Sequence, residues 1–258
     1  MIEQFFRPEQ LGQALELKAR FGNDAVYMGG GSKLNAAPTR TDKKVAISLG
    51  RLGLGQIEQQ RGQLHIGATV TLQALKDDPR TPAALCEALG FVYSRHLRNQ
   101  ATIGGEIACQ QQDSPLLPVL LVLEAVVVLE NNQLQPIDAY LAGQRKELVL
   151  GVVLPEPALR CATRRISRNA DGLAVMTAAV ALDALGEMRV ALAGVTPQPM
   201  RLRDVERHEL RDAALEAAVS ALIAPRADLG GSVAYKRYIS GVVVADLLVE
   251  CQQQEVQA

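Results

Sequence analysis

The first part of the chain alternates between helical and strand spacing of its apolar residues. Residues 9–21 place apolar side chains at helical intervals, with charged residues on the other face. A short apolar segment follows and leads directly into a run of glycines. Further on, Leu64, Ile66 and Ala68 alternate with polar residues, which is typical of a half-buried strand. These patterns predict a helix over 9–21 and strands over 25–28, 43–49 and 63–70.

The middle of the chain is more continuously apolar. Thr81 and Pro82 indicate the start of a helix with Thr81 as its N-cap, because proline is favoured in the first helical turn. The segment Pro155-Glu156-Pro157 ends the last apolar run, and we expect a domain boundary there. The predicted elements are helices over 81–89 and 115–123 and strands over 125–130 and 147–154.

The last hundred residues change character. Three stretches with strand character are joined by turns at 169–172 and at Gly186, and helical patterns follow. Antiparallel strands followed by helices indicate a small α+β domain. The sequence therefore predicts an α+β protein with one domain over 1–157 and a second over 158–258. The second domain is expected to hold strands over 160–168, 173–182 and 187–195 and helices over 202–210, 213–222 and 232–251.

Charge and composition exclude several classes of protein. The chain has 27 Lys and Arg against 28 Asp and Glu, and this balance argues against sequence-independent binding to nucleic acid. No stretch reaches the roughly 18 uncharged apolar residues of a membrane span. The first residues lack the basic and apolar regions of a secretory signal. We therefore expect a cytoplasmic protein without a membrane segment.

The metal-ligating residues are scattered. The four cysteines lie far apart without a C-x-x-C pair, and none of the three histidines is paired at metal-ligand spacing. We therefore expect no iron–sulfur cluster, no zinc site and no disulfide framework in this chain. No Ser/His/Asp arrangement or pair of carboxylates stands out, so we assign no catalytic residue.

Two glycine-rich segments are the strongest candidates for a binding site. Residues 29–34 follow a predicted strand, and consecutive glycines allow backbone N–H groups to approach an anion. Gly104 and Gly105 lie between β-branched residues and also allow close approach of a ligand. Taken singly, the first segment also fits a tight loop and the second a bulge in a strand. Two such segments in one predicted domain favour an extended ligand.

Four motifs in order connect the chain with a known family. Residues 29–34 (GGGSKL) follow A-G-G-[ST]-x-L from Gly30 onward, and residues 97–107 follow [LV]-R-N-x-[AG]-T-[IL]-G-G-[NS]-[IL] at every position but Glu106. Residues 167–174 match a later strand motif loosely, and residues 231–237 fit G-S-x-x-Y-[KR]-R. In these motifs the chain resembles the FAD-binding subunits of the molybdenum hydroxylases, the xanthine dehydrogenase and carbon monoxide dehydrogenase group. Within this group it resembles the flavoprotein subunits linked to selenium-dependent molybdenum hydroxylases and to selenate reductases.

The resemblance implies a fold and a function. The fold is an N-terminal FAD-binding domain of two α/β lobes (PCMH/VAO-type) over 1–157, followed by a C-terminal α+β domain over 158–258 with a three-stranded antiparallel sheet and helices. The function is that of an oxidoreductase subunit that binds FAD. Its partners are a molybdopterin-binding subunit and a [2Fe-2S] subunit, and the electrons pass through FAD to NAD+ or another acceptor.

The resemblance also implies a set of cofactor contacts. The first glycine segment would hold the pyrophosphate, and the T-I-G-G segment would follow the ribityl and phosphate region. Arg164 would lie against the flavin ring, where a cation raises the reduction potential; the alternative is a surface cation on an edge strand. The implied cofactor-binding residues are Tyr27, Met28, Gly29, Gly30, Gly31, Ser32, Lys33, Leu34, Thr102, Ile103, Gly104, Gly105, Glu106, Ile107, Ser114, Leu150 and Arg164.

Two positions depart from the family pattern. Glu106 stands where the family usually has asparagine, and it is either a flavin contact or a solvated carboxylate. Pro115 stands where many members have a flavin-binding acid, which Asp113 replaces only if the loop shifts. These departures leave two other functions open. One is a scaffold subunit that has lost or weakened flavin binding, and the other is a stand-alone flavin-dependent NAD(P)H oxidoreductase.

Overall fold

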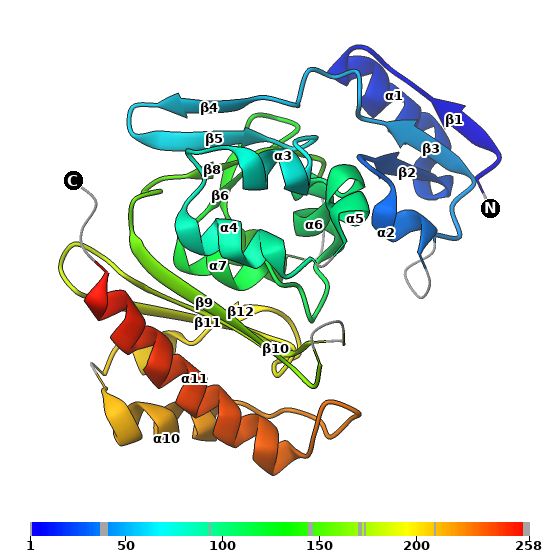
Figure 1. The fold of residues 1–258 in the computed structure, drawn as a ribbon. Coiled ribbons are helices and arrows are strands. Elements are labelled where there is room, and N and C mark those ends of the chain that lie inside the picture. The colour runs from blue at the N-terminus through cyan, green and yellow to red at the C-terminus, as the bar shows by residue number, and fades with distance from the viewer. Residues whose placement is uncertain are drawn as a thin grey trace.

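The computed structural model describes residues 2–36, 41–92, 94–143, 147–169, 172, 174–208 and 210–254. These residues form three sheets with helices packed around them (Figure 1). The mixture of helices and strands confirms the predicted α+β fold. No helix within the described ranges is long and apolar enough to cross a membrane.

The N-terminal lobe is a small parallel sheet with strand order β1-β3-β2. Helix α1 packs on it, and Ala14 together with Ala25, Val45 and Ile47 forms its own small core. The predicted helix and both predicted strands of this lobe are confirmed. The elements are β1 (Gln4–Phe6), α1 (Leu11–Phe21), the 3-10 helix η1 (Gly22–Asp24), β2 (Ala25–Met28), α2 (Ser32–Asn35) and β3 (Val45–Ser48).

The central lobe is an antiparallel sheet of order β4-β5-β8-β6-β7 with helices on one side. Its strands are β4 (Ile57–Gln60), β5 (Gln63–Gly67), β6 (Val126–Leu129), β7 (Leu134–Pro136) and β8 (Val149–Leu154). Its helices are α3 (Leu72–Asp77), α4 (Ala83–Gly90), α5 (Arg95–Gln100), α6 (Ile103–Cys109), α7 (Leu117–Val122) and α8 (Ile137–Ala142). Every residue of α7 is buried, as the apolar run in the sequence predicts.

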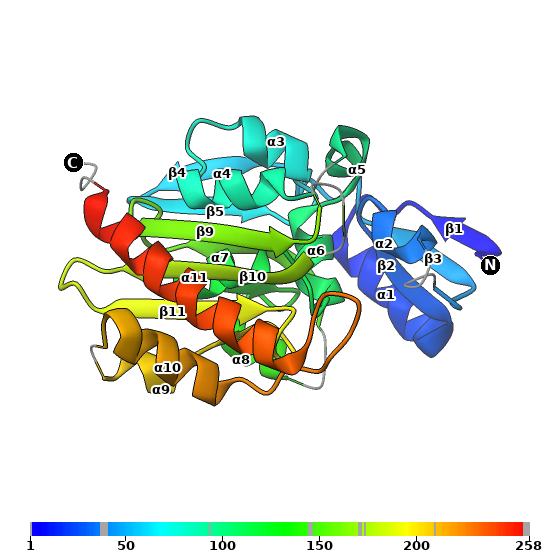
Figure 2. The same ribbon diagram turned by 60° about the horizontal axis from the view of Figure 1, so that its bottom comes forward.

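The C-terminal part is an antiparallel sheet between two layers of helices (Figures 1 and 2). One face meets α4 and α7 of the central lobe, and the other face is covered by α10 and α11. Its elements are β9 (Arg160–Ser167), β10 (Ala174–Leu182), β11 (Met188–Ala193), β12 (Met200–Arg201), α9 (Arg203–Glu206), α10 (Asp212–Leu222) and α11 (Val233–Gln253). Because β-strand side chains alternate between faces, β9, β10 and β11 each supply residues to both cores.

Three local predictions need correction. Thr81 is not an N-cap: the helix starts at Ala83 after Pro82, and the Thr81 hydroxyl donates to the carbonyl oxygen of Leu75. The predicted helix over 202–210 shrinks to the four residues of α9. The C-terminal sheet gains the two-residue strand β12, which pairs with β11 beyond the three predicted strands.

The start of α11 carries a buried lysine. Lys236 is only 2% exposed, and its ammonium donates to the carbonyl oxygen of Arg226 at 2.9 Å and to Asp228 Oδ2 at 2.5 Å. Ser232 caps the helix by accepting from the Tyr235 N–H. Lys236 therefore has a structural role, because it connects the preceding loop to α11.

Replacing the partner of this lysine is expected to destabilise the fold. In Asp228→Asn the buried ammonium loses its charged acceptor, so the free energy of unfolding should fall by about 1–3 kcal/mol. The hydrogen bond from Lys236, followed by the backbone N–H of Gly230, lowers the pKa of Asp228. The contribution of the pair is thus present at neutral pH and is lost as the pH falls through this lowered pKa. Urea unfolding of both proteins at neutral and acidic pH measures the difference, and equal stabilities at neutral pH would contradict the expectation.

Candidate functional site

The first glycine segment forms a tight connection between β2 and α2. Gly31 has φ +74°, a left-handed conformation that glycine adopts without strain. A Cβ atom on Gly30 would lie 1.5 Å from the carbonyl oxygen of Gln100, and one on Gly29 would lie 2.6 Å from Thr102 Oγ1. The loop therefore touches the second glycine segment directly, and only glycine allows that approach.

The second glycine segment begins helix α6. Thr102 is the N-cap, and its Oγ1 accepts from the Gly105 N–H at 3.2 Å. Gly104 packs on Ala68, whose carbonyl oxygen accepts from the Gly104 N–H at 3.0 Å. The alternative reading of a bulge in a strand is therefore wrong: the segment is the first turn of a helix fixed against the end of β5.

The two segments enclose one pocket of about 210 Å³. Most of the predicted residues of both segments line it, namely Tyr27, Gly29, Gly30, Gly31, Ser32, Lys33, Leu34, Thr102, Gly105 and Glu106. The segments are some seventy residues apart in the chain, and the parallel sheet of one lobe and the helix layer of the other bring them together (Figure 1).

The glycines in the lining carry backbone donors that no described residue uses. No acceptor among the described residues takes a hydrogen bond from the backbone N–H of Gly29, Gly30 or Gly31. Consecutive N–H groups of this kind form a concave site that suits an anion such as a phosphate. The pocket therefore has the donors that a diphosphate requires.

A charged network stands at one side of the pocket. Glu106 is only 3% exposed, and Ser114 Oγ donates to its Oε1 at 2.7 Å. Lys33 Nζ lies 3.6 Å from Glu106 Oε2 and donates to Gln111 Oε1. The interpretation of Glu106 as a solvated carboxylate is therefore wrong, because this carboxylate is buried and held by named partners.

Both glycine segments lie in a part of the chain that matches a known sequence family. Residues 1–157 match the family described as the FAD binding domain in molybdopterin dehydrogenase. The matched segment contains both glycine segments and the pocket between them. The chain belongs to this family. FAD is accordingly its cofactor, as the motifs predicted.

Relatives that match nearly the whole of this chain support the assignment to the molybdopterin dehydrogenase FAD-binding family. The chain is 56% identical over 253 residues to the uncharacterized protein YgfM of Escherichia coli K12, covering 98% of both chains. It is 25% identical to the carbon monoxide dehydrogenase medium chain of Hydrogenophaga pseudoflava, covering 93% of this chain and 94% of that one. It also superimposes with a TM-score of 0.87 and 25% identity on a chain of the solved carbon monoxide dehydrogenase from Hydrogenophaga pseudoflava that lacks the Mo-pyranopterin moiety, covering 98% of each chain.

Several predicted residues of this family member support the pocket without lining it. Ile103, Gly104 and Ile107 occupy the face of α6 that packs into the central lobe and are buried. Met28 lies beneath the loop, with its sulfur 3.1 Å from the position of a Gly31 Cβ atom. Ser114 acts through Glu106. Leu150 lies outside the lining, and its carbonyl oxygen accepts from the Ala68 N–H at 2.9 Å.

Arg164 is not brought to the pocket. Its guanidinium donates to Asp246 at 3.1 Å and to Glu250 at 3.0 Å, both on α11. Its side chain therefore lies on the face of the sheet that α10 and α11 cover, on the edge strand β9, and is 38% exposed. This placement matches the alternative of a surface cation on an edge strand. Asp113 is exposed and also lies outside the lining of the pocket.

The sequence predictions missed part of the lining. Val26, Ala101, Ala108 and Cys109 also face the pocket. Helical spacing could have indicated Cys109. In a helix, residue 109 lies one turn after Gly105 and therefore on the same face.

Two protonation states are defined by the surroundings of the pocket. Burial, and then the negative charge of Glu130, raises the pKa of Tyr27 to about 12, so its hydroxyl keeps its proton at neutral pH. Partial burial, and then the Glu106 carboxylate, raises the pKa of the Cys109 thiol. The lining of the pocket therefore presents a neutral thiol and a neutral phenol, which hold no reactive anion for covalent chemistry. Within the described residues no group of three or more His, Cys, Asp or Glu could hold a metal ion.

Proposed function

We propose that this chain is the FAD-binding, electron-transfer subunit of a multi-subunit molybdenum hydroxylase. The observation that carries the proposal is the pocket in which two glycine segments, distant in sequence, present unused N–H donors. The FAD-binding family match over residues 1–157 and the full-length similarity to a carbon monoxide dehydrogenase medium chain support it.

The residues of the pocket fit one section of FAD. At about 210 Å³ the pocket is smaller than the roughly 300–1,000 Å³ of sites that enclose a whole ligand of this kind, so we assign it to the diphosphate. The backbone N–H groups of Gly29–Gly31 would donate to the phosphate oxygens. The hydroxyl of Ser32 and the ammonium of Lys33 line the same pocket and would add a donor and a positive charge.

The chain itself orients the cofactor and tunes its surroundings. FAD, when bound, would accept electrons one at a time and pass them on singly or, as a pair, in a hydride. Thr102 fixes the first turn of α6, and Gly30 sets the distance between the two segments. Glu106 holds Lys33 at the pocket wall. None of these side chains is a nucleophile or acid–base pair for a substrate, which agrees with a subunit whose chemistry belongs to its cofactor.

In this proposal, other subunits carry out the electron-transfer steps before FAD. Since the described residues hold no cluster of metal ligands, the molybdenum centre and the iron–sulfur clusters would be on other subunits. We propose a molybdopterin-binding subunit and a [2Fe-2S] subunit as these partners, with NAD+ or another acceptor taking the electrons in the cytoplasm. The narrower link to selenate reductases stays a prediction from the motifs.

Titration of the purified full-length chain with FAD tests the function. We expect saturable binding of one FAD per chain, seen as a structured flavin absorption spectrum, and acceptor reduction when the chain is assembled with its partner subunits. Reduction of an acceptor by NADH with the isolated chain would instead favour a stand-alone oxidoreductase. A chain that assembles with partners but takes up no FAD would favour a scaffold, in which the buried carboxylate of Glu106 beside the phosphate site opposes binding.

A further inference from the structure

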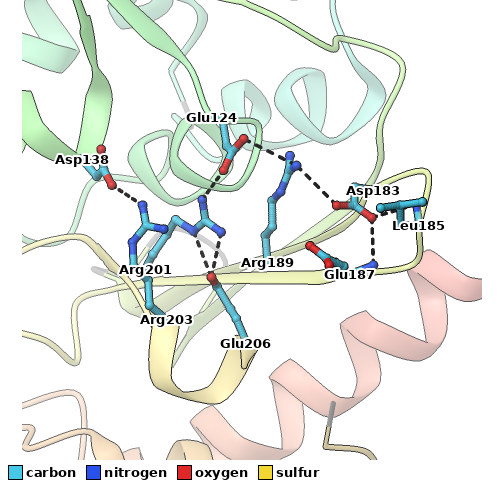
Figure 3. A network of polar contacts seen from close by, with 9 residues as sticks. All are labelled: Glu124, Asp138, Asp183, Leu185, Glu187, Arg189, Arg201, Arg203 and Glu206. Carbon is cyan, nitrogen blue, oxygen red and sulfur yellow. Dashed lines mark hydrogen bonds and ion pairs between the residues drawn. The ribbon is translucent and has the colours of Figure 1, made fainter. Parts of the chain in front are cut away.

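A second pocket lies far along the chain from the glycine segments. It has a volume of about 600 Å³ and is formed by the turn between β10 and β11, by β11 and β12, by α9, and by Glu124 after α7. Five arginines line it, namely Arg189, Arg201, Arg203, Arg207 and Arg211. No residue of the glycine pocket belongs to it. Figure 3 shows the ion pairs at its wall.

One wall of the pocket is a fixed ion-pair array. Arg201, only 8% exposed, donates from Nε and Nη2 to Glu206 at 2.9 and 2.7 Å and from Nη1 to Glu124 at 2.7 Å (Figure 3). Arg203 pairs with Asp138 of α8 (Figure 3). These guanidinium groups are engaged with carboxylates, so they shape the pocket and join the central lobe to the C-terminal part.

Arg189 has longer contacts with carboxylates than Arg201 and Arg203 have. Its side chain is 14% exposed, and its guanidinium lies 3.5 Å from Glu124 Oε2 and 3.6 Å from Asp183 Oδ2 (Figure 3). Charge-assisted hydrogen bonds of this kind are usually about 2.7–2.9 Å long. Within the described ranges, the Arg189 side chain makes no contact short enough for a hydrogen bond. The largely buried guanidinium of Arg189 thus lines the pocket. Its contacts with Glu124 and Asp183 are longer than ordinary charge-assisted hydrogen bonds.

Two arginines at the rim are also loosely held. Arg207 is largely exposed, and it contacts Asp204 at 3.4 Å. Arg211 donates to the carbonyl oxygen of the preceding residue, Leu210, at 2.9 Å. The exposed Arg207–Asp204 ion pair contributes little to stability, and the Arg211 guanidinium contacts only a neutral carbonyl oxygen in the described residues.

The charges around the pocket decide how a ligand would be recognised. Three glutamates share the lining with the five arginines, and Asp138, Asp183 and Asp204 pair with arginines from outside it. The arginine and carboxylate charges thus nearly cancel, and long-range attraction is small. Recognition of a ligand would therefore depend on hydrogen bonds from the arginine N–H groups. The planar guanidinium group can donate two of these bonds together to phosphate oxygens.

We propose that this pocket binds the phosphate group of a phosphorylated small molecule. Arg189, Arg207 and Arg211 line the same pocket, and a tetrahedral phosphate presents oxygens in several directions to guanidinium groups around it. A planar carboxylate has acceptors in one plane only. The volume of about 600 Å³ leaves room for a molecule of nucleotide size beyond the phosphate. The site is independent of the FAD assignment, because it shares no residue with the glycine pocket.

Calorimetric titration of the full chain with pyrophosphate tests the site. We expect a dissociation constant below about 1 mM, at least about tenfold weaker binding in Arg189→Gln, and a similar loss in the rim variant R207Q/R211Q. The rim residues are exposed, so this variant tests the site even if Arg189→Gln unfolds. Arg51→Gln is the matched control, because Arg51 is an exposed arginine of the N-terminal lobe paired with Glu9 at 2.9 Å; it should bind as the natural chain does.

Three outcomes would overturn the proposal. The first is the absence of pyrophosphate binding by the natural chain. The second is equal affinity in the natural chain and the rim variant, which would place the bound pyrophosphate elsewhere, such as at the glycine segments. The third is equal or tighter binding of succinate, which would make the site one for dicarboxylates.

Discussion

Gly30→Ala is expected to weaken FAD binding by at least about tenfold, and by about a hundredfold if the pocket opens fully. A Cβ atom at this position would lie 1.5 Å from the carbonyl oxygen of Gln100 and 2.6 Å from its carbonyl carbon. Both are backbone atoms, so no side-chain rotation relieves the overlap. The connection between β2 and α2 must move away from the start of α6, and the two halves of the phosphate site then separate.

Gly12→Ala is the matched control for this substitution. Gly12 lies in α1 with no heavy atom within 4 Å of its Cβ position and with an ordinary helical backbone. Alanine there is expected to leave FAD binding unchanged and to stabilise the helix slightly. Flavin fluorescence during titration measures the affinity, and thermal unfolding shows whether each variant folds. If a folded Gly30→Ala bound FAD as well as Gly12→Ala, the contact between the two segments would not define the site.

Glu106→Ala is expected to lower the free energy of unfolding by about 3 kcal/mol, near the lower end for a broken buried ion pair. The carboxylate is 3% exposed and joins three elements: α6, which carries it; Lys33 on α2; and Ser114 before α7. Ser114 Oγ also accepts from the N–H groups of Leu116 and Leu117 at the start of α7. Removal of the carboxylate leaves the Ser114 hydroxyl without its acceptor and removes the negative charge that faces Lys33.

Glu106→Gln separates the two contributions of this residue. The amide oxygen still accepts from Ser114, while the charge facing Lys33 is lost. We therefore expect a loss of only about 1 kcal/mol, because the ammonium of Lys33 is partly exposed and its ion pair is partly screened. Urea unfolding of the natural chain and both variants measures this order. A Glu106→Ala variant as stable as the natural chain would show that the buried network does not hold the lobes together.

Helices with long apolar periods were predictable from the sequence. Residues 9–21, 115–123 and 232–251 gave helices close to their predicted bounds, because their spacing repeats over several turns or their apolar run is continuous. The short helices α2, α3, α5 and α6 were not predicted. Helices of four to seven residues are not stable alone, and tertiary packing forms them from sequences that carry no strong period.

Arg164 shows why the sequence could not assign the face of a strand. Adjacent residues of β9 point to opposite sides of the sheet, so Arg164 and Arg165 differ completely in their surroundings. Ala162, two residues before Arg164, packs into the core under α10 and α11, while Cys161 packs against the central lobe. Which side meets the FAD-binding lobes depends on how the C-terminal sheet docks, and no local pattern in the strand records that.

The sequence by itself determined three properties of the protein. It has two glycine segments able to approach an anion, a near-neutral charge without metal-ligand clusters, and an α+β order of elements. These properties depend on residue type and local spacing. Only the tertiary structure decided that Gly30 meets Gln100, that the Glu106 carboxylate is buried against Ser114 and Lys33, and that Arg164 lies against α11. Such contacts join residues far apart in the chain, and they are set by packing between lobes, which acts on whole surfaces and leaves no motif in any one segment.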